Sequence, residues 1–137
     1  MLIELFILFI SPLAFWKIKR IFPRWIGLDL YLICTLLATH FFGKNAGVLV
    51  GILSPLYWAF SKKDLSMIFV SVILGFSAWF YSVLFFSFIT KGIIVALTYS
   101  VICYLFYSFL GKNSLIFSVT YLITNILQIV LAARWFL

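Results

Sequence analysis

Long apolar runs separated by short breaks make up almost the whole of this chain. The apolar runs are residues 2–16, 26–42, 46–60, 65–89, 93–110 and 114–137. Every break between them carries Lys or Arg, and most also carry Gly, Asn or Ser, which is typical of short turns. A spanning helix needs about 20 apolar residues. The pattern therefore predicts six membrane spans, of which the first is short.

Helices rather than strands are expected for these spans. A transmembrane β-strand has about 10 residues of alternating polarity, whereas these runs are longer and apolar on all sides. A helix also satisfies its backbone polar groups within one segment. The sequence thus predicts an all-α, polytopic transmembrane bundle that forms a single integral membrane domain over residues 1–137.

The composition agrees with a membrane environment. Hydrophobic residues make up 66% of the 137 residues and charged residues 9%, and the mean hydropathy is +1.27. A soluble domain could not build its polar surface from so few charges, so we expect a multi-pass protein of the cell membrane, surrounded by the lipid bilayer. The net charge of +7 does not indicate nucleic-acid binding, because nine of the ten Lys and Arg residues lie in the breaks and they do not follow one helical face.

The distribution of Lys and Arg predicts which side of the membrane each break faces. Cytoplasmic loops carry an excess of these residues. The first, third and fifth breaks hold seven of them, and the second break, the fourth break and the C-terminal segment hold three. With six spans, this distribution puts both termini outside the cytoplasm.

Two breaks share a short motif. Residues 41–45 are Phe-Phe-Gly-Lys-Asn and residues 109–113 are Phe-Leu-Gly-Lys-Asn, an offset of 68 positions, which is close to half of the chain. Two interpretations stay open. The motif indicates either an inverted repeat of three plus three spans, as in many transporters, or a chance recurrence, since Gly, Lys and Asn suit any tight turn.

Polar residues form a stripe along the last span. Ser114, Ser118, Tyr121, Asn125 and Gln128 follow one another at spacings of 4, 3, 4 and 3 residues, which places them on one helical face. Lipid offers these groups no partner, so the stripe is expected to face protein or water. It can serve adhesion to a neighbouring helix, or it can bind or conduct a solute.

Small residues at helical spacing predict close helix contacts in the third and fourth spans. The third span carries Gly47 and Gly51, and the fourth carries Gly75, Ala78 and Ser82. Small residues three or four positions apart let two helix backbones approach closely. We therefore expect these five residues to serve packing.

Few other residues could carry chemistry. Asp29, near the start of the second span, can be a solvated helix cap or a contact for a ligand or proton. His40 has no Cys or carboxylate nearby with which to bind a metal, and Cys34 and Cys103 lie mid-span as expected packing residues. No phosphate-binding loop and no paired acids occur in the sequence. An enzyme, a cofactor and a metal site are therefore not expected.

The segment over residues 29–56 resembles part of a known family pattern. Gly43, Ala46, Gly47 and Gly51 surround the start of an apolar helix. This resembles the second and third helices of substrate-binding S components of energy-coupling factor vitamin transporters, and of the six-helix rod-shape protein MreD. In both, Gly-Pro-x-Ala-Gly precedes the helix, where this chain has Lys-Asn in place of Pro-x. The resemblance implies cytoplasmic termini, opposite to the orientation that the charges predict.

Two functions are expected from these features. In the first, the chain is a solute-binding or transport component similar to an S component, with Ser118, Tyr121, Asn125, Gln128 and Asp29 at the site. Such a component needs partner subunits, because nothing in the sequence is suited to hydrolysing ATP. In the second, the chain is a non-catalytic scaffold or assembly subunit of a larger membrane complex, MreD-like or respiratory-type, and the stripe binds neighbouring helices.

Overall fold

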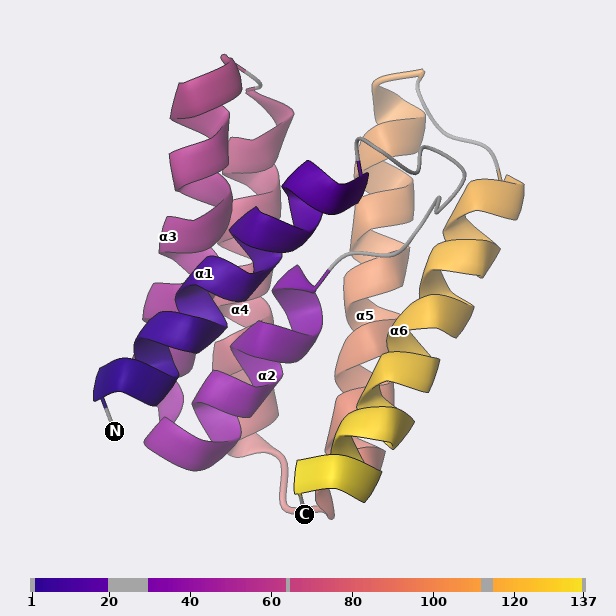
Figure 1. Cartoon of the computed structure of the whole chain (residues 1–137). Helices are drawn as coiled ribbons and strands as arrows, with labels where there is room; N and C mark the ends of the chain where they lie inside the picture. Colours follow the sequence, from indigo (N-terminus) through magenta and orange to yellow (C-terminus); the bar gives the residue numbers. More distant parts are fainter. Residues whose placement is uncertain (1, 20–29, 64, 112–114, 137) are drawn as a thin grey trace.

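The computed structural model describes residues 2–19, 30–63, 65–111 and 115–136, and the regular structure in this part of the chain is all helical. The helices are α1 (Leu2–Lys19), α2 (Tyr31–Phe42), α3 (Lys44–Lys62), α4 (Ser66–Val83), α5 (Phe88–Phe109) and α6 (Leu115–Phe136). Figure 1 shows them running alternately up and down, with the start of α1 and the end of α6 towards the same end of the bundle. The predicted all-α class is confirmed.

The short helix α2 is the centre of the bundle. It packs against each of the other five helices, and every residue from Tyr31 to Thr39 is buried. A helix that is apolar all round is suited to such a position. Its two threonine hydroxyls donate to carbonyl oxygens one turn back, Thr35 to Tyr31 at 2.7 Å and Thr39 to Thr35 at 2.8 Å. These bonds offset the cost of burying the hydroxyls.

Two of the glycines that were expected to serve packing lie where α3 approaches α2 and α4. A Cβ atom on Gly47 would overlap the side chain of Thr39 in α2. A Cβ atom on Gly51 would lie 3.1 Å from the carbonyl group of Leu74 in α4. At both positions a larger residue would push two helix backbones apart.

The three small residues of α4 lie in different surroundings. A Cβ atom on Gly75 would lie 2.9 Å from the Ile52 side chain in α3, and Ala78 is fully buried. Ser82 is half-buried and donates a hydrogen bond of 2.7 Å to the Trp79 carbonyl oxygen within its own helix. Gly75 and Ala78 thus lie within the packed part of the bundle, and Ser82 lies at its edge.

The start of α5 differs from the predicted break at residues 90–92. The structure begins α5 at Phe88, so this segment lies in the first turns of the helix. Ser87 caps the helix, because its hydroxyl oxygen accepts a hydrogen bond of 3.4 Å from the backbone N–H of Thr90. Serine is among the residues that satisfy the free N–H groups of a helix start best. The charged and small residues that suggested a turn are therefore accommodated inside the helix.

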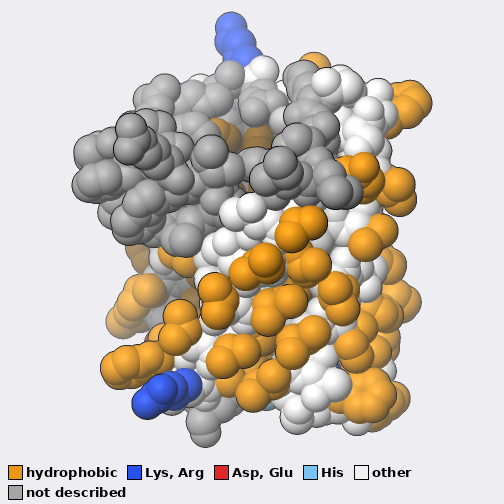
Figure 2. Space-filling model, turned by 90° about the vertical axis from the view of Figure 1, so that its right-hand side faces the viewer, with side chains coloured by type: hydrophobic (Ala, Val, Ile, Leu, Met, Phe, Trp, Pro, Cys, Tyr) orange, Lys and Arg blue, Asp and Glu red, His pale blue; other side chains and the backbone are white. Residues whose placement is uncertain are grey.

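Three helices contain stretches long and apolar enough to cross a membrane. These stretches are Ser66–Val83, Phe88–Phe109 and Ser118–Phe136, whereas the apolar stretches Leu2–Ala14 and Tyr31–Phe42 are shorter. Figure 2 shows hydrophobic side chains over much of the described part of one face, with Lys or Arg near its upper and lower ends. Such a surface is suited to a hydrocarbon environment between two charged boundaries.

Candidate functional site

A groove of about 780 Å³ lies between α1, α2 and α6. This volume is within the range of roughly 300–1,000 Å³ that is usual for small-molecule sites. Most of its lining is apolar. The lining residues are Glu4, Ile7, Leu8 and Ser11 from α1, Leu30, Ile33, Cys34, Leu37, Phe41 and Phe42 from α2 and its N-cap, and Gln128, Leu131, Ala132, Trp135 and Phe136 from α6.

The arrangement of the three helices explains why a groove forms. Helices α1 and α6 both pack against α2, but within the described residues they do not pack against each other. Figure 1 shows them on either side of α2. Helix α2 is therefore the floor of the groove, and α1 and α6 are its walls. Each wall presents one helical face, since its lining residues recur at spacings of three, four and seven.

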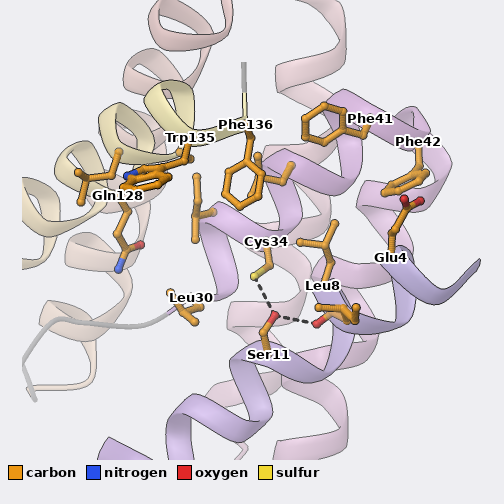
Figure 3. Close-up of a pocket in the computed structure, with 15 residues that line it drawn as sticks. Glu4, Leu8, Ser11, Leu30, Cys34, Phe41, Phe42, Gln128, Trp135 and Phe136 are labelled. Carbon is orange, nitrogen blue, oxygen red and sulfur yellow. Dashed lines mark hydrogen bonds between the residues drawn. The ribbon is translucent and has the colours of Figure 1, made fainter. Parts of the chain in front are cut away.

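Ser11 and Cys34 form a polar contact within the groove. The Ser11 hydroxyl donates to the Ile7 carbonyl oxygen at 2.7 Å and lies 3.5 Å from the sulfur of Cys34, as Figure 3 shows. Cys34 is buried, in keeping with the packing role expected for it. The Ser11 hydroxyl therefore already donates its hydrogen bond within α1, and the pair of Ser11 and Cys34 adds little polarity to the groove.

Gln128 brings an unsatisfied polar group to the α6 wall. Both the nitrogen and the oxygen of its amide are buried, and neither has a hydrogen-bond partner among the described residues. A buried polar group without a partner costs about 1–3 kcal/mol. The amide can donate two hydrogen bonds and accept at least one. It therefore offers bonding capacity to a molecule that enters the groove.

The amide of Asn125, one turn earlier on α6, is also buried and without a hydrogen-bond partner among the described residues. Its side chain is 1% exposed, and both amide atoms lack a partner in the described part of the chain. It is not among the residues that line the groove. The structure thus brings Gln128 to the cavity and leaves Asn125 inside the helix packing.

The remaining stripe residues have other surroundings. The Tyr121 hydroxyl lies 3.2 Å from the hydroxyl of Tyr99 on α5, so this part of the stripe joins two helices. Ser118 is half-buried. Ser114 and Asp29 lie outside the described residues, and the structure does not bear on them. Along α6, Tyr121 therefore contacts a neighbouring helix, whereas the Gln128 amide lies unpaired on the groove wall.

Sequence reasoning did not single out Glu4 as a site residue. It lines the groove from the first turn of α1. The signal was present in the sequence: this acid shares a helical face with Ile7, Leu8 and Ser11, at positions 3, 4 and 7 residues further on. A carboxylate on an otherwise apolar face is unusual enough to mark that face.

A second polar cluster lies outside the groove lining. The Nδ1 atom of His40 is 3.2 Å from the hydroxyl of Tyr81, and the Lys91 ammonium lies 5.3 Å from the centre of the Tyr81 ring. The His40 ring also meets the Phe88 ring edge-on, with 5.1 Å between centroids. These contacts join α2, α4 and α5. His40 therefore takes part in the packing between these three helices.

The groove offers contacts for binding. An apolar body would contact the floor and walls, with the Gln128 amide as an unpaired polar contact. Among the described residues no group of three His, Cys, Asp or Glu side chains that could hold a metal ion occurs. No protein-family model, curated protein or solved structure matches this chain.

Proposed function

We propose that this chain is a multi-pass membrane protein with six spans that binds a small, mainly apolar solute in the groove between α1, α2 and α6. The observation that carries the proposal is the Gln128 amide, which is buried, unpaired and on the wall of an apolar cavity of about 780 Å³. A cavity of this mainly apolar composition disfavours strongly hydrated solutes, because few of its groups can replace their water. An apolar molecule with a few hydrogen-bonding groups fits it best.

The position of the groove supports entry from the membrane. Its two walls do not meet within the described residues, so its long side is not closed by a helix. An apolar solute dissolved in the bilayer could then enter sideways between α1 and α6. Transport of such a solute would require partner subunits, as in the S components that the segment over residues 29–56 resembles.

Mass spectrometry of the gently solubilised protein tests this function. We expect the wild type to carry a bound small molecule, visible as added mass on the native protein, and Gln128→Leu to lose most of it. Thr124→Val is the matched control on the same helix, because the Thr124 hydroxyl already donates to the Thr120 carbonyl oxygen at 2.8 Å. It should retain the added mass.

The scaffold function predicts a different outcome for the same variants. If the polar stripe binds neighbouring subunits, Gln128→Leu should reduce co-purification of other membrane proteins, and no added mass should be found on the wild type. That result would contradict solute binding and favour an assembly subunit. Retention of the same added mass in Gln128→Leu and Thr124→Val would contradict the role given to the amide.

Single cysteines test the six-span topology and its orientation. Lys44 and Lys63 are exposed at opposite ends of α3. We expect Lys44→Cys to react with a membrane-impermeant maleimide added to intact cells, and Lys63→Cys to react only after the cells are opened. The native Cys34 and Cys103 are buried and supply the background. The reverse pattern would invert the orientation, and labelling of both positions from one side would exclude α3 as a span.

A further inference from the structure

The Gln128 amide presents a donor and an acceptor side by side. Its nitrogen and its oxygen are both buried, and neither has a hydrogen-bond partner among the described residues. The group carries two N–H donors on its nitrogen and acceptor lone pairs on its oxygen. One N–H and the C=O therefore form a single edge of the planar amide. A guest that bonds only one of the two atoms leaves the other unpaired, at the full cost of a buried polar atom.

Two hydroxyl groups of the wall helices donate within their own helices and not to this amide. On α1, the Ser11 hydroxyl donates to the Ile7 carbonyl oxygen. On α6, the Thr124 hydroxyl donates to the Thr120 carbonyl oxygen. The last torsion of a glutamine side chain is broad, so the amide can turn within the groove without any movement of α6. Its edge is therefore available to a guest.

The charges around the groove disfavour an ionised head group at the amide. No Lys or Arg occurs among the described residues that line the groove. Glu4 comes from the α1 wall, and Figure 3 shows it on the opposite side of the cavity from Gln128. A carboxylate or an ammonium group at the amide would be buried without an opposite charge beside it. Such burial costs far more than burial of a neutral group that is hydrogen-bonded.

The α6 wall gives the tail of a guest a direction. In Figure 3 the Gln128 side chain extends from α6 away from the rings of Trp135 and Phe136. Trp135 follows Gln128 by seven residues, or about 10 Å along the helix axis. Between these two residues, Leu131 and Ala132 line the groove. The apolar tail of a guest held at the amide can thus lie along this wall toward the aromatic rings.

We propose that the groove selects neutral amphiphiles with a primary amide head group. The guest N–H donates to Gln128 Oε1, Gln128 Nε2 donates to the guest carbonyl oxygen, and the tail lies along Leu131 toward Trp135. The proposal rests on the solute-binding function above and names its substrate class. A primary amide has an N–H and its C=O on one edge, as Gln128 has. A secondary amide is trans and points them in opposite directions, and a ketone has the acceptor alone.

Two neutral probes test this selectivity. Octanamide and 2-nonanone share a heptyl chain and a carbonyl group, and differ in an amino group in place of a methyl group. Binding is measured on the purified full-length protein in neutral-lipid nanodiscs. Gln128→Met in the same nanodiscs removes the amide at a similar side-chain length, so comparison of the two proteins cancels the partitioning of each probe into lipid. We expect the preference for octanamide to be about tenfold greater in the wild type, the effect of one unmet hydrogen bond in a buried site.

Two further probes show whether the paired edge is the cause. N-methyloctanamide has a donor and an acceptor on opposite sides, and we expect it to lose most of the advantage of octanamide. Octanoate is charged and should also bind more weakly than octanamide. Thr124→Val is the control variant on the same helix and should keep the full preference. Equal preference in the wild type and Gln128→Met, or binding of N-methyloctanamide or octanoate as tight as that of octanamide, would overturn the proposal.

A groove-filling variant distinguishes failure of this inference from failure of the proposed function. Leu131 is 54% exposed and lines the groove, so Leu131→Trp narrows the cavity from an accessible position. If octanamide and 2-nonanone bind equally, are unaffected by Gln128→Met and are lost in Leu131→Trp, amide selectivity is wrong and solute binding stands. The same conclusion follows if the wild type carries added mass but binds none of the probes. If no probe binds and the wild type carries no added mass, both proposals fail.

Discussion

Replacing Gly47 with alanine should destabilise the protein, although alanine is the better helix former. A Cβ atom at this position would overlap Thr39 Oγ1 and lie 2.8 Å from Thr39 Cβ and 3.0 Å from its Cα. The Cα atom belongs to the backbone of α2, so no rotamer of Thr39 relieves the contact. Overpacking of this kind costs about 1–3 kcal/mol, whereas the gain in helix propensity is about 1 kcal/mol. The expected result is a net loss, and Gly47→Leu should prevent folding to a monodisperse protein.

Unfolding in mixed micelles, followed by far-UV circular dichroism, measures this loss. Leu49→Phe is the matched control, because it adds volume on the same helix at a side chain that is 54% exposed. It should unfold as the wild type does. The Thr39→Ala background removes the hydroxyl nearest to the new Cβ, so Gly47→Ala should cost less there than in the wild type. Wild-type stability of Gly47→Ala would show that α2 and α3 do not approach this closely.

The helical class of the fold follows directly from the apolar runs. Each run is long and apolar on all sides, and only a helix satisfies the backbone of such a run without water. The expected segment 46–60, for example, lies within α3 (Lys44–Lys62). Whether all six helices cross the membrane remains a prediction, because α1 and α2 contain shorter apolar stretches than α4, α5 and α6 do.

The predicted start of α5 was wrong, because a segment that contains a charged residue was interpreted as a turn. Residues 90–92 combine polar, charged and small side chains, which suit a break in a membrane protein. In the structure, Ser87 caps the helix and the Lys91 ammonium lies over the Tyr81 ring. Gly92 lies where a Cβ atom would be 2.7 Å from Ile129 on α6. The contacts of Lys91 and Gly92 depend on tertiary neighbours, which the local pattern does not contain, whereas the Ser87 cap is a local signal that the prediction missed.

The groove could be predicted only in part. The stripe on α6 indicated that Gln128 meets something other than lipid, and the spacing from Glu4 to Ser11 marks one face of α1. Each face is visible in the sequence by itself. The sequence does not show that the two faces meet in one groove, because this depends on which helices flank α2. The separation of Tyr121, paired with Tyr99, from the unpaired Asn125 and Gln128 also depends on that packing.

Replacing Asn125 with leucine should stabilise the solute-free protein. The Asn125 side chain is 1% exposed and its amide has no partner among the described residues. Burial of such a group costs about 1–3 kcal/mol. Leucine has the same branching at Cγ as asparagine and removes this cost without adding a polar group. We therefore expect the free energy of unfolding to rise by about 1–2 kcal/mol, an unusual sign because most substitutions of buried residues destabilise.

Tyr121→Phe is the matched control for this effect, because it also removes a polar group from α6. The Tyr121 hydroxyl lies 3.2 Å from that of Tyr99, so its loss breaks a hydrogen bond between α5 and α6. Such bonds between membrane helices contribute about 0.6 kcal/mol on average, and Tyr121→Phe should be slightly destabilised. The two variants should therefore shift the unfolding transition in opposite directions in the same micelles. A loss of stability in Asn125→Leu would mean that the amide is satisfied in the folded protein. Asn125 would then belong with Tyr121 as an adhesive residue, and Gln128 would be the one unpaired amide among the described residues of α6.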